Sequence, residues 1–325
     1  MNASAMKRNQ ERLFSAAQKF IASSPLVVWG SGATAPCGLP TMRKLAEHLR
    51  STVAPDLKDS GNLEKELGDD KYEDRIDAIR QEIWNKIVEA DVKVPDKILD
   101  GDDEYLNAIG ELIGKIYSTH PQVVNFVTTN YDRVLEYVAA KNGYLVTDGT
   151  NMSTLSTFDE RAFDRDKMVH VIKVHGSLSW FSVNGEVRYS CRGLLHREPI
   201  IIIPGKRKYR DVLQIPYREL IRKSDELIAK AGSILVVGFG FNDEHITPEL
   251  VKKVRHGVPV VVVTKNVTED CHRELSVATK MLLIENDESR KGFTKVTYRN
   301  QPETDEVVFS VSGEYWKLNK FMEAI

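Results

Sequence analysis

Short runs of apolar, mostly β-branched residues recur along this chain and constrain its fold more than any other feature. In several runs the apolar residues occupy consecutive positions, which is typical of strands covered on both faces. The runs are Leu26–Trp29, Val123–Thr128, Val169–Val174, Ile200–Ile203, Ile234–Val237, Val258–Val263 and Met281–Ile284. Helical patterns lie between them, for example Tyr217–Lys230, Glu244–His256 and Thr268–Thr279. This alternation predicts an α/β fold with a doubly wound, parallel, Rossmann-like sheet.

One long segment interrupts the alternation. Residues 55–120 are charged and have a helical pattern without a strand-like run. We therefore expect a helical subdomain inserted into a sheet domain made of residues 1–54 and 121–285. Within the sheet domain, residues 147–167 have the pattern of a loop-rich excursion.

The C-terminal part of the chain, residues 286–325, has a different pattern. Two alternating runs, Phe293–Tyr298 and Glu306–Val311, are separated by a polar turn. Alternation of apolar and polar residues is typical of half-buried strands. The pattern predicts a β-hairpin followed by a short last helix.

The composition argues against several classes of protein. The chain has 325 residues, 42% hydrophobic and 28% charged, with a formal charge of -2, so no global basic field favours nucleic acid or an anionic membrane. Its first residues are too polar for a signal peptide, and no apolar run approaches membrane-spanning length. The basic cluster Lys206-Arg207-Lys208-Tyr209-Arg210 is interpreted as a solvated loop, which could steer an anionic cofactor or partner.

The cysteines bear on both location and metal binding. Cys37, Cys191 and Cys271 are odd in number and widely separated, which favours a reducing, cytoplasmic environment. They form no CxxC pair and cannot supply a four-thiolate zinc site. We therefore expect no metal.

A glycine-bearing turn follows the first strand. Leu26–Trp29 continues into Gly30-Ser31-Gly32-Ala33-Thr34-Ala35, a G-x-G-x-x-A pattern in which the backbone can approach a pyrophosphate. A plain strand-to-helix turn is the alternative interpretation. Pro36 and Pro40 disfavour a helix before Thr41, so we expect an extended loop over a cofactor rather than the tight turn of a dehydrogenase.

Residues 30–43 resemble the cofactor-binding loop of the sirtuins, G-A-G-x-S-x-x-x-G-I-P-x-F-R, without a gap. The resemblance implies an NAD site that includes Gly30, Ser31, Gly32, Ala33, Thr34, Pro40 and Arg43. Thr41 and Met42 replace residues with which that family covers the nicotinamide, so we expect a change in what shares the pocket.

A polar cluster, Thr129-Asn130-Tyr131-Asp132, follows the second strand, where open α/β sheets bind ligands. Asn130 or Asp132 could instead cap the helix expected at Arg133–Ala140. The cluster resembles the sirtuin T-Q-N-I-D motif, with Thr129 in place of Gln. By that resemblance Asn130 contacts the nicotinamide-side ribose and the attacking group, and Asp132 holds the carboxamide.

A histidine follows the strand that ends at Val174. His175 and His170 are five residues apart, so on a strand they face opposite sides and cannot form a metal pair. A lone histidine here is commonly a partly buried structural residue, but Gly176 permits a sharp turn that exposes the imidazole. The sirtuin H-G pair supplies the catalytic base, and by resemblance His175 has that role.

A second glycine-bearing turn, Gly238-Phe239-Gly240-Phe241-Asn242, follows Ile234–Val237. It resembles the sirtuin G-T-S loop against the adenosine half of NAD, which implies cofactor contacts for Gly238, Phe239 and Gly240. The resemblance of the earlier cluster to T-Q-N-I-D implies a cofactor contact for Thr129 as well. Asn266, after the next strand, is the candidate for the adenosine ribose. Asp243, Glu244 and His245 are interpreted mainly as helix caps and dipole partners.

The motifs occur in the sirtuin order across residues 20–285, apart from the helical segment, and their form (TTNYD, KVHGS, GFGFND) is similar to sirtuin-like effectors of bacterial anti-phage systems. That resemblance implies an NAD glycohydrolase without the zinc ribbon, with water as acceptor and NAD as substrate. A zinc-free deacylase or ADP-ribosyl transferase, or a non-catalytic sensor of NAD or an ADP-ribose derivative, is the alternative. The retained Asn130 and His175 argue against a sensor.

An unrestrained NADase would harm its host, so we expect control of its activity. The chain has no G-x-x-x-x-G-K-[ST] motif. We therefore predict a separately encoded regulatory or sensor/ATPase subunit, a homo-oligomeric assembly and weak activity of the isolated chain. The helical segment and the terminal hairpin are the expected assembly surfaces.

Overall fold

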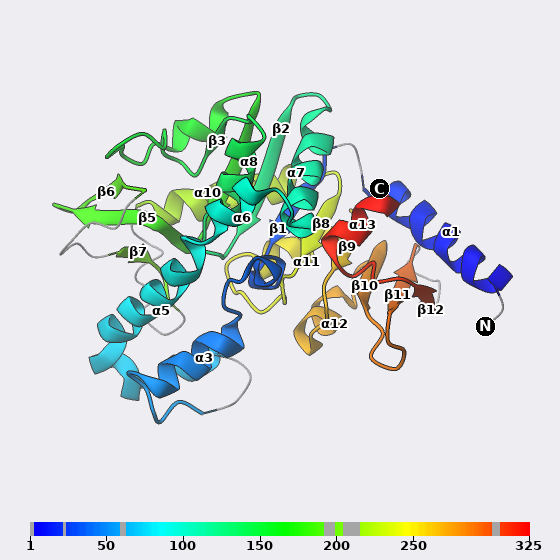
Figure 1. Ribbon diagram of the computed structural model, residues 1–325, viewed down its shortest axis with the longest axis horizontal. Coiled ribbons are helices and arrows are strands. Elements are labelled where there is room, and N and C mark those ends of the chain that lie inside the picture. The colour runs from blue at the N-terminus through cyan, green and yellow to red at the C-terminus, as the bar shows by residue number, and fades with distance from the viewer. Residues whose placement is uncertain (1–2, 22–23, 59–62, 192–198, 204–214, 301–305) are drawn as a thin grey trace.

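The molecule is built around a nine-stranded sheet, seen in the computed structural model (Figure 1). The structure describes residues 3–21, 24–58, 63–191, 199–203, 215–300 and 306–325, so the basic cluster at 206–210 and most of the polar turn before residue 306 lie outside the described residues. The strand order is β12-β11-β10-β9-β8-β1-β2-β4-β3. The strands are β1 (Leu26–Trp29), β2 (Val123–Thr128), β3 (Val146–Thr147), β4 (Met168–Lys173), β8 (Ile234–Val237), β9 (Val260–Val263), β10 (Met281–Asn286), β11 (Phe293–Arg299) and β12 (Val307–Ser312).

Strands β10 to β3 in this order pair in parallel, and only β11 and β12 are antiparallel. Successive residues of a strand enter two separate cores: Val27 packs in one and Val28 in the other. The consecutive apolar positions of the sequence are explained by this double coverage, because the central parallel strands β1, β8 and β9 are buried on both faces. The α/β, doubly wound fold is confirmed.

Helices cover both faces of the sheet. The first core is shared with α1 (Ala3–Phe20), α7 (Glu104–Tyr117), α8 (Val134–Lys141) and α13 (Leu318–Phe321). The second is shared with α10 (Tyr217–Lys230), α11 (Thr247–Arg255) and α12 (Glu269–Leu275). Helix α1, which the polar N-terminal sequence did not lead us to expect, buries Leu13, Ala17 and Phe20. No helix in the described part of the chain is long and apolar enough to cross a membrane.

The described residues between β1 and β2 are helical, as the charge pattern predicts. They form α3 (Met42–Ser51), α4 (Leu63–Leu67), a 3-10 turn (Asp70–Arg75), α5 (Ile76–Asp91), α6 (Val94–Asp100) and α7. Helix α7 packs against β2, and its Ile109, Leu112 and Ile113 belong to the sheet's core. In Figure 1, α3 and α5 lie to one side of the main sheet and the helices that cover it. The division of the chain into a sheet domain and an insert stays a prediction.

A second sheet changes one sequence-based expectation. Its strands are β5 (Gly176–Val183), β6 (Glu186–Tyr189) and β7 (Pro199–Ile201), in the order β6-β5-β7, and both pairings are antiparallel. The prediction that the run Ile200–Ile203 belongs to the parallel sheet is therefore wrong. Gly176, with a φ of 93°, turns the chain out of the main sheet directly after β4, and β7 pairs with the strand that follows.

The C-terminal hairpin is confirmed. β11 and β12 pair antiparallel, with Val296 opposite Phe309, and β11 continues the main sheet alongside β10. Helix α13 follows, and Figure 1 shows it near the N-terminal helix α1.

Candidate active site

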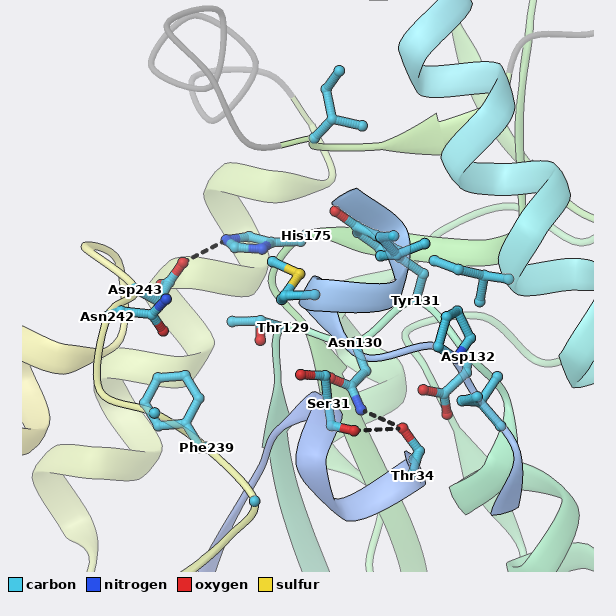
Figure 2. A pocket seen from close by; sticks show the side chains of 18 of the residues that line it. Ser31, Thr34, Thr129, Asn130, Tyr131, Asp132, His175, Phe239, Asn242 and Asp243 are labelled. Atoms are coloured by element: carbon cyan, nitrogen blue, oxygen red, sulfur yellow. Dashed lines mark hydrogen bonds and ion pairs between the residues drawn. The ribbon is translucent and has the colours of Figure 1, made fainter. Parts of the chain in front are cut away.

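A cavity lies at the carboxyl ends of β1, β2, β4 and β8, where parallel sheets place their ligand sites (Figure 2). Six chain segments separated in sequence meet there. The lining residues are Ser31, Thr34, Leu39, Pro40, Met42, Leu45, Ile87, Thr129, Asn130, Tyr131, Asp132, His175, Ile202, Ile203, Gly238, Phe239, Gly240, Asn242 and Asp243. One wall is apolar, and the polar groups come mainly from the ends of β2, β4 and β8.

The loop after β1 is more helical than the sequence analysis expects. A short helix, α2 (Ser31–Thr34), begins directly after Gly30, and a 3-10 turn (Ala35–Cys37) follows it. The expectation of an extended loop up to Thr41 is therefore wrong. Pro36 occupies the first turn of the 3-10 segment, where its missing N–H removes no hydrogen bond. Helix α3 does begin as predicted, because the Thr41 side chain caps it by accepting from the Lys44 N–H.

The two glycine-bearing turns pack backbone against backbone. The Gly32 N–H donates to the Gly238 carbonyl at 3.0 Å, and the Gly30 N–H donates to the Val237 carbonyl at 2.9 Å. A Cβ atom on Gly30 would lie 2.3 Å from the Gly238 oxygen, and one on Gly238 would lie 2.1 Å from the Ala33 nitrogen. Gly238 also has a φ of 59°. Contact this close requires glycine on both sides.

Asn130 joins the turn after β2 to the turn after β1. Its side-chain Nδ2 donates to the Gly30 carbonyl at 3.1 Å. It also donates to the Thr34 hydroxyl at 3.3 Å (Figure 2). Its own N–H donates to the Thr128 hydroxyl, which in turn donates to the Trp29 carbonyl at 2.6 Å. The side chain is 8% exposed and held in one orientation at the wall of the cavity.

Asp132 is a buried carboxylate, 6% exposed. Removal from water raises the pKa of Asp132 to about 6, and the nearby Lys173 ammonium partly opposes this rise. Its Oδ1 accepts from the Val134 N–H at 3.3 Å, so the capping interpretation holds in part. A carboxylate that only capped a helix could remain exposed to solvent, so capping alone does not explain the burial of Asp132.

Two buried ion pairs support the backbone around Asp132. The Lys173 Nζ lies 2.5 Å from Glu136 Oε1 and donates to the Asp132 carbonyl. On the other side, the Arg133 side chain lies 2.6 Å from Asp91 at the end of α5, and Asp91 also accepts from the Arg133 N–H. Burying such charges is costly unless they are paired, so each pair rigidly fixes the turn to its neighbours.

His175 lies two residues beyond the end of β4 and is 8% exposed. Its Nε2 lies 3.0 Å from Asp243 Oδ2 and 3.4 Å from His245 Nδ1. The other carboxylate oxygen of Asp243 accepts from the N–H groups of His245 and Ile246. Asp243 therefore caps the turn before α11 rather than the helix itself, whose N-cap is Ile246. It is also a partner of His175 (Figure 2), which the sequence did not lead us to expect. Its place directly after a glycine turn at a strand's carboxyl end was the available signal.

The structure gathers most of the residues that the sequence analysis singled out. The cavity is lined by Ser31, Thr34, Pro40, Thr129, Asn130, Asp132, His175, Gly238, Phe239 and Gly240. Gly30, Gly32 and Ala33 lie behind them, at the contact between the two turns. Arg43 and Asn266 do not line this cavity: Arg43 pairs with Glu47 on the surface, and Asn266 donates to Glu288. Met42, Ile87, Tyr131, Asn242 and Asp243 are lining residues without a predicted binding role.

A family comparison covers part of this arrangement. Residues 124–264 match the SIR2-like domain. The matched segment contains Asn130, Asp132, His175 and the second glycine turn, and the first glycine turn lies before it. No protein with a curated description matches the chain.

Solved structures similar to the chain include sirtuins. One, described as concerning the mechanism and regulation of Sir2 enzymes, has 13% identity over 98% of this chain and 96% of that chain, with a TM-score of 0.46. A structure concerning sirtuin substrate affinity has 14% identity over 86% and 93%, with a TM-score of 0.45. A Sir2 protein bound to an acetylated peptide has 15% identity over 84% and 91%, with a TM-score of 0.43. These likenesses are distant, and the fold class rests on the strand order described above.

Proposed function

We propose that the chain is an NAD glycohydrolase, which cleaves NAD to nicotinamide and ADP-ribose. The observation that carries the proposal is the convergence of Asn130, Asp132 and His175 on one cavity beside two interlocked glycine turns. A SIR2-like domain match over the segment that holds all three residues supports an NAD-using enzyme.

The proposed position of NAD follows from the walls of the cavity. The glycine backbones at Gly30, Gly32 and Gly238 let the two turns interlock. The pyrophosphate would lie on the cavity side of that contact, against Ser31 and Gly238. The adenosine half would lie toward Phe239 and Gly240, and the nicotinamide half toward the apolar wall near Met42. Arg43 and Asn266, which the resemblance also implies, would reach NAD only after a rearrangement of their surface contacts.

Cleavage of the nicotinamide–ribose bond has an oxocarbenium-like transition state, so the protein must position the ribose and the acceptor and hold the leaving group. We assign the ribose and the attacking water to Asn130, whose Nδ2 contacts fix the amide plane. Asp132 holds the carboxamide of the leaving nicotinamide. Its burial between two ion-paired elements keeps that carboxylate in place.

His175 is assigned to the water or the ribose hydroxyl as base. The carboxylate of Asp243 faces Nε2, which favours the tautomer with the hydrogen on Nε2 and leaves the lone pair on Nδ1. Asp243 thus acts as a positioning residue, because it fixes the ring and its tautomer without touching the reacting atoms.

Water is the proposed acceptor because the sequence lacks the four thiolates of the zinc ribbon that shapes the peptide groove of deacetylases. Its three cysteines cannot build a zinc ribbon, and Cys37 and Cys271 are buried in separate places. The segment after His175 folds instead into β5 and β6. Hydrolysis with a separately encoded regulatory partner, in a homo-oligomer, would suit an NAD-depleting effector of abortive anti-phage defence.

Purified protein incubated with NAD tests the proposal. We expect Asn130→Ala and His175→Ala to abolish NAD loss while the thermal melting profile remains that of a folded protein. The matched control is His272→Ala, an exposed histidine on α12 away from the cavity, which should retain activity. Full activity in either site variant would refute the assignment. Adding the product of the neighbouring gene should raise the rate, and a full rate without it would remove the case for a regulatory partner.

A further inference from the structure

Three side chains at one end of the cavity place ligand atoms around a common point. His175 Nε2 lies 3.0 Å from Asp243 Oδ2 and 3.4 Å from His245 Nδ1, and all three ligand atoms lie within 4.8 Å of one another. His175 comes from the end of β4, whereas Asp243 and His245 come from the turn after β8. His175 and Asp243 also line the cavity, so the cluster is open to a ligand on that side.

The two separations from His175 Nε2 are close to those between ligands of a tetrahedral zinc ion. With Zn–N and Zn–O bonds of about 2.0–2.2 Å, two ligand atoms at a tetrahedral angle lie roughly 3.3–3.5 Å apart. The separations of 3.0 and 3.4 Å need only small adjustments to reach that geometry. Two imidazoles and one carboxylate form a donor set that suits Zn²⁺ better than Mg²⁺ or Ca²⁺, which prefer oxygen ligands.

The Asp243 carboxylate is held in place by hydrogen bonds, as carboxylates that ligate metals commonly are. Asp243 Oδ1 accepts from the N–H groups of His245 at 3.0 Å and Ile246 at 3.1 Å, which leaves Oδ2 directed toward His175. Hydrogen bonds of this kind orient a ligand before the ion arrives. On the other side, the His175 carbonyl accepts from the Ile202 N–H at 2.8 Å, which fixes the backbone of the β4 end.

We propose that His175, Asp243 and His245 form a binding site for Zn²⁺, with the fourth position facing the cavity, and that zinc inhibits the enzyme. Inhibition rests on the proposed hydrolase function. Zinc bound to His175 Nε2 requires the ring hydrogen to be on Nδ1, so the lone pair used as base is lost. A dication beside an oxocarbenium-like transition state also opposes the developing positive charge.

Metal binding can be tested without any activity assay. The probe is Co²⁺, titrated into untagged, chelator-treated protein that carries Cys191→Ser, because Cys191 is an exposed thiol that could bind metal itself. We expect an intense visible absorption typical of tetrahedral Co²⁺, saturating at one ion per chain and lost when Zn²⁺ is added. Absence of that absorption, or retention of it after an excess of Zn²⁺, would overturn the site.

Variants assign the binding to these residues. His245→Ala and His245→Gln should each weaken Co²⁺ binding at least about tenfold, since even the loss of an outer partner commonly costs 10- to 100-fold. His272→Ala, the exposed control, should bind as the parent does. Melting profiles establish that each variant is folded, and the two substitutions at His245 guard against one that fails to fold. Equal affinity in the His245 variants and the parent would refute the assignment.

The inhibitory part has its own measurement. Zn²⁺ at a concentration that saturates the site should slow NAD cleavage by the parent at least about tenfold, and a chelator should restore the rate. Cleavage at an unchanged rate with the site saturated would overturn inhibition. A Co²⁺ absorption in protein that never cleaves NAD would leave the metal site intact and refute only the hydrolase proposal.

Discussion

The close contact between the two glycine turns predicts how much stability each Gly→Ala substitution loses. Four glycines of this chain allow two causes of that loss to be measured separately. An added Cβ can clash with its surroundings, and it can be strained by a positive φ. Gly238 combines both, with a φ of 59° and a Cβ position 2.1 Å from the Ala33 nitrogen. Gly30 has only the clash, 2.3 Å from the Gly238 oxygen, and Gly101 has only the positive φ of 80°. Gly232 has neither.

The expected losses of unfolding free energy follow from these two effects. Alanine in a left-handed conformation costs roughly 1–2 kcal/mol, which is the expectation for Gly101→Ala. Forcing extra atoms into a packed interior costs roughly 1–3 kcal/mol, which is the expectation for Gly30→Ala. Gly238→Ala should therefore lose about 2–5 kcal/mol, the sum of both. Gly232→Ala should stay within about 0.5–1 kcal/mol of the parent.

Urea denaturation followed by tryptophan fluorescence, together with melting temperatures, gives the ranking of the four variants. Gly238→Ala should have the lowest midpoint, and it should also bind NAD more weakly because the turns are forced apart. If Gly30→Ala were as stable as Gly232→Ala, the two turns would not pack as described. If Gly238→Ala were no less stable than Gly101→Ala, the close contact of Gly238 with the first turn would add nothing to the loss of unfolding free energy.

Three further predictions concern the acidic residues near the cavity. Because burial raises the pKa of Asp132 to about 6, the stability that this carboxyl contributes in its protonated form is lost as the pH rises from about 4 through about 6. Asp132→Asn should thus be more stable than the parent by up to about 2–3 kcal/mol near neutral pH and similar to it near pH 4 in denaturation curves; no change in the difference with pH would contradict this. Asp91→Ala leaves the buried Arg133 without its carboxylate partner and should cost about 3–5 kcal/mol, read from the same curves; a loss under about 1 kcal/mol would show that the pair does not fix the turn. Asp243→Asn keeps one oxygen for the His245 and Ile246 N–H groups but loses the carboxylate that faces His175, so it should lower kcat roughly 10²–10⁴-fold with little change in the KM for NAD; a raised KM with unchanged kcat would give Asp243 a binding role instead.

The parts of the fold that the sequence predicts best are those where local pattern and burial agree. β1, β2 and β8 have the predicted bounds because each apolar run is buried on both faces and ends at a polar residue or glycine. Helix α10 also has its predicted bounds, since its apolar residues recur at helical spacing. The hairpin was predictable because each strand alternates and a polar turn separates them.

The missed features depend on tertiary contacts. Helix α1 is polar over most of its length, and its buried residues are selected by packing against β12, β10 and β9. The strand pairing of β7 depends on the sharp turn at Gly176, which redirects the chain into a second sheet. The His175–Asp243 pair joins the ends of β4 and β8, which are far apart in the sequence. The strand order brings the two side chains to 3.0 Å, so the spacing of the motifs does not reveal the pair. The position of Asp243 after a glycine turn was the one signal in the sequence.

The central claim is that the cavity cleaves NAD with water as acceptor, and a product balance tests it most directly. Purified protein, with its partner subunit where one is required, is incubated with NAD as the only added substrate, and products are quantified by mass. The account predicts equal amounts of nicotinamide and free ADP-ribose, with neither formed by Asn130→Ala or His175→Ala. Nicotinamide release that requires an acyl peptide, ADP-ribose found only on protein, or no cleavage would contradict it.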